Sequence, residues 1–394
     1  MKPSTLRFSL ICDSANIETA ERVIKPFRTA PNFADFRIRL SLERNGSLQQ
    51  LANEISMRSM GYRYPSSQLP FRYLDLPLEI RFKILEYTDL VTPLRQVEWS
   101  SKNKFGIHYS ALSCGNECGW KGPCSPIRYP SCQFRNCWRL DQENSGCFCQ
   151  NHHAAFSSIC RCWVPPTSLF LVCRELQQNA EAVFYAKNRF VIVPPLFECY
   201  EPVRSTPDRL DVSKFLRDFV SPEAVGFLKY LDVVFPPFYD DYLGYDEPAY
   251  QDWLQTIDHI GNLANLPMLT LRVSMADIDL EPQYLDEYRT RMSIEKRNTI
   301  LKVYHRVLKP LLKLRGKGLD RLTFFVDLIL PVAHTPRFQT QIQENPNYCC
   351  AMRTTLRLWG ERMVMGSEYD SEKLRTGKPE DAQWQMRSFE SVYC

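Results

Sequence analysis

The chain has 394 residues and a formal net charge of only +4, from 49 basic and 45 acidic residues. This balance gives no electrostatic argument for nucleic acid as a partner. Hydrophobic residues make up 44% of the chain and aromatic residues 12%, which is enough for folded domains. No apolar run is long enough to span a bilayer and the N-terminus shows no cleavage-site pattern. We therefore expect an intracellular protein, cytoplasmic or nuclear, without a membrane partner.

The first 60 residues predict a strand–helix–strand segment. Residues 5–12 and 36–42 alternate as strands do, and residues 17–30 between them predict a helix. A further short helix is expected over Gln49–Met60. This segment is either the remnant of a duplicated copy of the later repeats or a piece that completes their sheet.

Residues 74–88 (LDLPLEIRFKILEYT) predict an amphipathic helix. Pro77 suits the first helical position, and Glu79 stands one helical turn before Lys83, at the spacing of an ion pair. The apolar arc is wide for so short a helix, because it consists of two adjacent rows: Leu78, Phe82 and Leu85, then Ile80 and Ile84. It is either an ordinary core helix or one whose second face meets a partner.

A Cys-rich stretch, residues 114–162, follows an expected hairpin over residues 97–110 and holds nine of the fifteen cysteines. Inside a cell, such a cluster favours metal ligation or free thiols over a disulfide framework. The stretch has no pair of C-x2-C motifs, so free or partly buried thiols remain an alternative to metal. The densest part would supply the ligands of a structural zinc ion, Cys147, Cys149, His152, His153, Cys160 and Cys162.

The second half predicts an irregular α/β array. Ser168–Asn188 reads as a helix with Val172, Leu176, Ala180 and Val183 on one face, and Phe190–Val193 reads as a strand. Helix then precedes strand three more times, over residues 212–235, 250–275 and 294–330. Such repetition indicates neighbouring strands backed by helices, as in a degenerate leucine-rich-repeat-like array. An ordinary α/β domain is the alternative.

Catalytic motifs are lacking: the sequence has no G-x-S-x-G, no Gly-rich phosphate loop and no H-E-x-x-H, so we expect a protein that is not an enzyme. His259 and His305 fall in predicted helices without carboxylate or cysteine partners. The helix over Ile294–Leu314 carries a basic face, either solvated or able to meet an acidic partner or a membrane. Its basic residues are Lys302, Arg306, Lys309 and Lys313, with Val303, Val307 and Leu311 nearly opposite.

Two segments together resemble a known family. Residues 76–90 (LPLEIRFKILEYTDL) resemble the first half of an F-box. Residues 169–192 (LFLVCRELQQNAEAVFYAKNRFVI) resemble the helix that follows in F-box-like proteins of filamentous fungi. The matching positions of this second segment are Val172, Cys173, Arg174, Ala182, Tyr185, Asn188 and Phe190. One departure is the stretch 91–168, which separates the two halves and is tolerable only if its ends return close together.

The resemblance implies a substrate-recognition adaptor for a cullin–RING (SCF-type) ubiquitin ligase. Its helix would dock on a Skp-type adaptor through Leu76, Pro77, Leu78, Ile80, Ile84 and Leu85, and the array would bind the protein substrate. The alternative function is a zinc-stabilised interaction scaffold without a ligase role.

The expected fold is α+β or α/β: a split F-box-like helical unit with a Cys-rich insertion, plus the helix–strand array. The expected segments are residues 1–60, 70–195 with the insertion at 95–166, 205–335, and a charged C-terminal region at 336–394.

Overall fold

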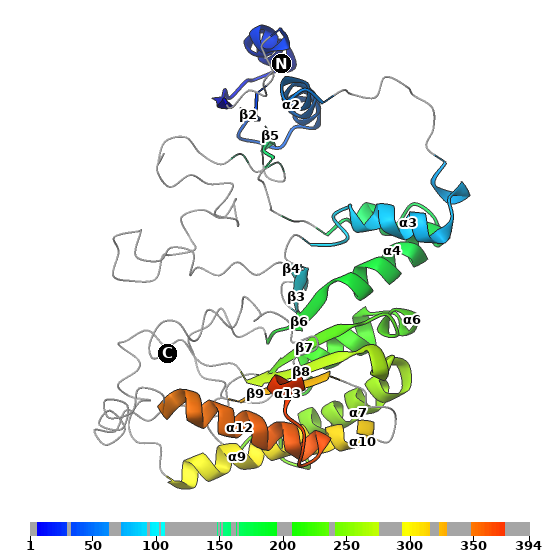
Figure 1. The fold of residues 1–394 in the computed structure, drawn as a ribbon, viewed down its shortest axis with the longest axis vertical. Helices are drawn as coiled ribbons and strands as arrows, with labels where there is room; N and C mark the ends of the chain where they lie inside the picture. Colours follow the sequence, from blue (N-terminus) through cyan, green and yellow to red (C-terminus); the bar gives the residue numbers. More distant parts are fainter. Residues whose placement is uncertain are drawn as a thin grey trace. The chain divides into compact units, whose positions relative to one another are not determined.

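The computed structural model describes residues 6–29, 33–62, 72–92, 95–101, 104–106, 148, 150, 153–158, 163, 165–194, 207–235, 241–275, 294–315, 323–328 and 348–374. They form helices and two β-sheets, so the fold is mixed α and β, as predicted (Figure 1). The chain divides into two compact units, residues 1–77 with 111–164 and residues 78–110 with 165–394. The four segments expected from the sequence stay a prediction. In the part of the chain that is described, no helix is long and apolar enough to cross a membrane.

The first unit contains a three-stranded sheet in the order β1-β2-β5. β1 (Arg7–Ile11) runs parallel to β2 (Asp35–Ser41), and β5 (Ala154–Phe156) runs antiparallel to it. Helix α1 (Ile17–Ile24) and the 3-10 helix η1 (Lys25–Arg28) join β1 to β2, and α2 (Gly46–Ser59) follows. The predicted strands and helices are therefore confirmed. They form a sheet of their own, so the alternative that they complete the sheet of the array is wrong.

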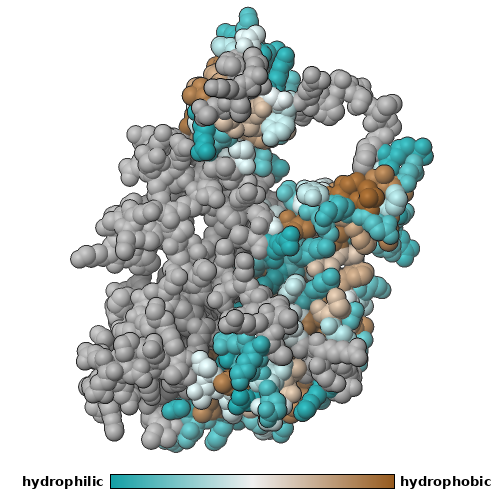
Figure 2. Space-filling model, viewed as in Figure 1, coloured by the Kyte–Doolittle hydropathy of each residue, from teal (hydrophilic) through white to brown (hydrophobic). Residues whose placement is uncertain are grey.

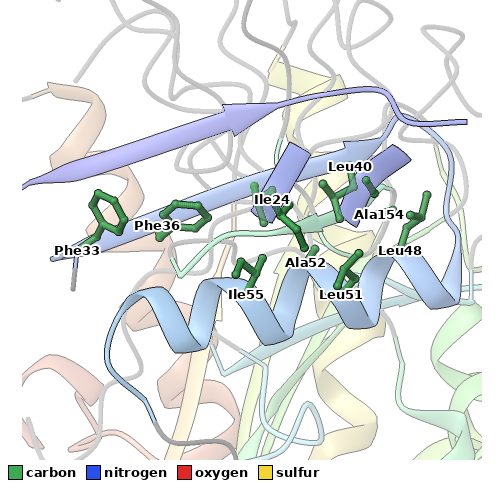
Figure 3. Packing of buried hydrophobic residues seen from close by; sticks show 11 residues of the cluster. Ile24, Phe33, Phe36, Leu40, Leu48, Leu51, Ala52, Ile55 and Ala154 are labelled. Atoms are coloured by element: carbon green, nitrogen blue, oxygen red, sulfur yellow. The ribbon is translucent and has the colours of Figure 1, made fainter. Parts of the chain in front are cut away.

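The core of this unit lies between α2 and β2. Figure 3 shows apolar side chains of α2 directed at those of β2, and the cluster includes Ile24, Phe36, Leu40, Leu48, Leu51, Ala52 and Ile55, all buried. Gln49 fastens β5 to this layer, since its side-chain amide donates to the Ala155 carbonyl and accepts from the Ala155 N–H at 3.1 Å. β5 lies within the Cys-rich stretch, where no strand was expected. Three residues are too few to show a period, and the pairing with β2 defines the strand.

The second unit contains a six-stranded sheet in the order β4-β3-β6-β7-β8-β9. All neighbours are parallel except β3 and β4, which form the predicted hairpin. β6, β7, β8 and β9 lie side by side in the order of the chain, and β3 separates β4 from β6. The hairpin thus belongs to the main sheet. The strands are β3 (Gln96–Ser100), β4 (Lys104–Gly106), β6 (Arg189–Ile192), β7 (Tyr230–Phe235), β8 (Thr270–Met275) and β9 (Thr323–Asp327).

Helices precede the parallel strands of this sheet as the sequence predicts, and Figure 1 shows α7, α9 and α12 together on one side of β7–β9. The Trp253 indole, fully buried in α7, donates to the Val307 carbonyl of α9 at 2.9 Å and ties these helices together. Longer elements are α3 (Leu78–Glu86), α4 (Arg174–Lys187), the π-helix η8 (Lys214–Phe219), α7 (Pro248–Leu263), α9 (Ile294–Leu308) and α12 (Tyr348–Met365). Shorter ones are η6 (Thr167–Phe170), α5 (Asp211–Ser213), α6 (Pro222–Val225), η9 (Leu266–Met268), η10 (Lys309–Leu311), α10 (Leu312–Arg315) and α13 (Ser371–Leu374).

One helix boundary differs from the prediction. The expected helix over Ser168–Asn188 begins only at Arg174, because Cys173 is extended and its sulfur accepts the Leu176 N–H at 3.5 Å as an N-cap. Val172 therefore precedes the helix and does not lie on its buried face. The long helix from Ile294 extends to Arg315 as predicted, and it changes to a 3-10 turn around Pro310, which has no N–H to donate to the preceding turn.

Among the described strands, β9 has β8 as its one neighbour, and a tyrosine occupies part of its other edge. The Tyr369 hydroxyl accepts from the Phe324 N–H at 2.8 Å and donates to the Phe324 carbonyl at 2.9 Å, as a neighbouring strand would. The side chain is largely buried, and this burial raises its pKa to about 12. Tyr369 thus satisfies the backbone groups of Phe324 at the edge of the sheet.

Candidate docking surface

The six residues predicted to meet an adaptor fall at the start of α3 and along it. Leu76 is extended and half-buried just before the helix, and Pro77 is exposed. Of the α3 residues, Leu78 is 44% exposed and Ile80 48%, Ile84 is half-buried, and Leu85 is 2% exposed. The apolar arc therefore has two parts. Leu85 anchors the helix to its own unit, and Leu78 and Ile80 face solvent.

The predicted ion pair between Glu79 and Lys83 is wrong. The Lys83 ammonium pairs with Glu86 instead, at 3.2 Å, and lies 5.6 Å from the centre of the Tyr87 ring. Glu79 stays in the first turn, where its carboxylate meets the positive end of the helix dipole. The Tyr87 side chain is 83% exposed and stands two turns from Ile80, on the same side of α3. The outward side of α3 thus ends in an exposed aromatic ring.

Helices α3 and α4 pack side by side and run parallel (Figure 1). Near their N-termini the Arg81 guanidinium pairs with the Glu175 carboxylate. At their C-termini the Lys187 ammonium lies 2.7 Å from the Glu86 carboxylate. Equivalent ends meet in both pairs, which only a parallel arrangement allows. The structure therefore joins the two F-box-like segments although residues 91–168 separate them.

The fully buried Asn188, the C-cap of α4, fastens this junction. Its amide nitrogen donates to the carbonyls of Leu90 at 2.7 Å and Phe184 at 2.8 Å, and its oxygen accepts the Thr92 N–H at 2.9 Å. One side chain thus caps the last turn of α4 and holds the segment that follows α3. These bonds give a physical reason for an asparagine at position 188, one of the positions that carry the resemblance. Phe190, another of them, is fully buried and stacks on Tyr185 with ring centroids 5.1 Å apart.

Two further apolar side chains are exposed just before α4, Leu171 at 82% and Val172 at 66%. They lie at the α4 end that carries Glu175, the partner of Arg81, so they stand by the N-terminal end of α3. Figure 2 shows hydrophobic colour gathered over α3. We name the exposed apolar residues of this helix pair the α3–α4 surface: Leu78, Ile80, Tyr87, Leu171 and Val172.

The charges around the α3–α4 surface are structural. Hydrogen bonding from Lys187 is the main cause that lowers the pKa of Glu86, against the opposing effect of burial. Glu86 bridges Lys187 of α4 and Lys83 of α3. Burial raises the pKa of Asp89, just beyond the helix. The chemistry offered to a partner is therefore mainly apolar, with the exposed Arg174 beside it.

Of the predicted zinc ligands, only His153 is described; Cys147, Cys149, His152, Cys160 and Cys162 lie outside the described residues. His153 is buried in the first unit, and its Nδ1 lies 2.6 Å from the Leu42 carbonyl oxygen. Among the residues with described positions, no group of three potential metal ligands comes together.

Of the two histidines in predicted helices, His259 has a structural contact. His259 is half-buried in α7, and its Nε2 lies 3.0 Å from the Leu216 carbonyl oxygen of the π-helix. Burial is the main cause that lowers its pKa.

The side of the helix opposite the basic face is fully buried. Its residues are Val303, Val307 and Leu311, which the sequence places nearly opposite the basic residues.

Comparisons with models of known protein families, with curated proteins and with solved structures find no match to this chain.

Proposed function

We propose that this chain is an F-box-like substrate-recognition adaptor, which docks on a Skp-type protein through α3 and thereby joins a cullin–RING ubiquitin ligase. The observation that carries the proposal is the exposure of Ile80 and Tyr87 on one side of α3, while Leu85 on the other side is buried. Leu78, at the first helical position, is exposed as well. Large apolar side chains exposed together on a helix are the usual anchors of helix-in-groove recognition.

The junction between α3 and α4 supports the same proposal. An F-box requires its helices to be packed against each other, and the long stretch 91–168 is the main objection to a functional one. Two ion pairs and the three hydrogen bonds of Asn188 hold the helices together across that stretch. Leu171 and Val172 then add apolar surface at the same end of the pair.

The substrate would be bound by the helix–strand array of the second unit, in this proposal a leucine-rich-repeat-like array. The sequential order of β3, β6, β7, β8 and β9, all parallel, supports this assignment. In such arrays each unit stacks on its neighbours, and the extended surface suits protein recognition. The chain itself would then perform no chemistry, and ubiquitin transfer would belong to the ligase.

Co-elution with a purified Skp-type adaptor on size-exclusion chromatography tests the proposal. The wild-type chain is expected to co-elute, and Ile80→Asp is expected to separate from the adaptor, because a carboxylate would be buried in an apolar groove. Met268→Asp is the matched control, since Met268 is 54% exposed on η9 of the same unit, outside the α3–α4 surface. Failure of the folded wild-type chain to co-elute would overturn the proposal and leave the zinc-stabilised scaffold as the alternative.

A further inference from the structure

A hollow of about 450 Å³ lies on the outer face of α9. Asn298, Leu301, Lys302 and His305 line it at the spacing of one helix face, together with Arg306 and with Tyr245 from the turn before α7. The opposite face of α9 is in the core, where Val303 and Val307 are fully buried. The helix is thus fixed from behind, and the lining residues are held in place on a rigid element.

Arg306 lines this hollow and is held in place by three contacts. Its guanidinium pairs with the Asp241 carboxylate, donates to the Tyr242 carbonyl at 2.9 Å, and lies 5.5 Å from the centre of the Tyr245 ring. The Tyr245 ring is still 51% exposed, so it offers an aromatic edge to a ligand. Arg306 therefore holds the Tyr245 ring in position, and its charge is largely neutralised by Asp241.

Lys302 is the cation that remains available, and His305 adds ring nitrogens that can form hydrogen bonds. Neither forms an ion pair or a hydrogen bond with another residue that the structure describes, and Lys302 is exposed. None of the described side chains that line the hollow is acidic. Asp241 lies outside the lining, and so does Glu247, whose carboxylate accepts the Leu243 N–H at 3.0 Å. The hollow is thus positively charged, with an amide donor at Asn298.

We propose that this hollow binds an acidic segment of a partner protein, with carboxylate or phosphorylated side chains on Lys302 and His305 and an adjacent residue against Tyr245. Two observations favour a protein segment. The charges complement an acidic chain, and the aromatic ring offers contact area that a lone anion cannot use. The inference does not depend on the docking of α3, because the residues are different.

The test uses the full chain and short fluorescein-labelled peptides that carry glutamate, glutamine or phosphoserine at the same positions, followed by fluorescence anisotropy. We expect the glutamate and phosphoserine peptides to bind and the glutamine peptide not to bind. Lys302→Glu should weaken binding by about tenfold or more, since a cation that contacts the ligand is replaced by a like charge. Ile80→Asp should leave peptide binding unchanged, which separates this proposal from adaptor docking.

Lys309→Glu is the matched control. Lys309 is the next exposed lysine on this side of the helix, lies in η10 outside the hollow, and forms no ion pair among the described residues. Equal loss of binding in both variants would mean diffuse attraction to the basic face and would overturn the assignment to the hollow. Equal binding of the glutamine peptide would overturn it as well. Inorganic phosphate that competes at the affinity of the phosphoserine peptide would show a small-anion site in place of a docking site.

Discussion

Asn188→Ala is expected to be among the most damaging single substitutions in the second unit. It removes three buried hydrogen bonds and leaves the Thr92 N–H and the carbonyls of Leu90 and Phe184 without this partner. Leu90 is fully buried, Thr92 is 2% exposed and Phe184 2%, so water cannot easily replace the amide. A buried polar group left unpaired costs about 1–3 kcal/mol, so we expect a loss of about 3–5 kcal/mol in the free energy of unfolding.

Urea unfolding of the wild type and the variant, followed by tryptophan fluorescence, measures this loss. Asn179→Ala is the control, because Asn179 is also in α4 and 7% exposed, and its side-chain nitrogen has no hydrogen-bond partner among the described residues. That substitution should cost less than about 1 kcal/mol. Asn188→Asp should be at least as damaging as Asn188→Ala, because a carboxylate oxygen would face two carbonyls.

Hydrogen exchange adds a local readout. If Asn188 joins the segment after α3 to α4, exchange in α3 of Asn188→Ala should accelerate more than exchange in α9. Equal losses of stability in Asn188→Ala and Asn179→Ala would refute the role given to Asn188. They would also remove the main support for a joined F-box-like unit.

Two further substitutions have expected outcomes. Tyr369→Phe leaves the Phe324 N–H and carbonyl without the hydroxyl, so unfolding should become easier by about 1–3 kcal/mol in a urea titration. Because the folded pKa of Tyr369 is raised from 10.0 to about 12, its contribution to stability is complete below pH 10 and lost as the pH rises toward 12. The stability of the Tyr369→Phe variant should therefore fall less between pH 10 and pH 12 than that of the wild type. An equal fall in both proteins would contradict this role of Tyr369. Glu86→Gln should cost about 0.2–1 kcal/mol at neutral pH. Since the folded pKa of Glu86 is lowered below 4.5, the wild type should lose this contribution on acidification below about that pH, and the difference between the two proteins should shrink there.

The alternation and helical periodicity of the sequence predict most of this fold. β8 is an example: its apolar residues Leu271, Val273 and Met275 stand at every second position of the sequence, although the whole strand is buried. The order of strands in the sheet follows from the short connections between helix and strand. β5 could not be predicted, because its three residues are a strand only through pairing with β2.

The candidate site was only partly predictable. Periodicity places Leu78, Ile80 and Leu85 on an apolar arc but cannot say that Leu85 is buried and the other two exposed, since that depends on where α4 packs. The start of α4 depends on an unusual cysteine N-cap, which moved Val172 from an expected core position to the surface. The role of Asn188 depends on contacts with residues far away in the sequence, Leu90 and Thr92.

Titration calorimetry of a purified Skp-type adaptor into the full chain tests the central claim most directly. The account predicts saturable binding with a negative heat-capacity change, because apolar surface on α3 leaves water. Ile80→Asp should weaken this binding by at least about thirtyfold, as expected when a central anchor worth about 2 kcal/mol is lost, and Met268→Asp should bind as the wild type does. Binding of Ile80→Asp with the affinity of the wild type would contradict docking through α3.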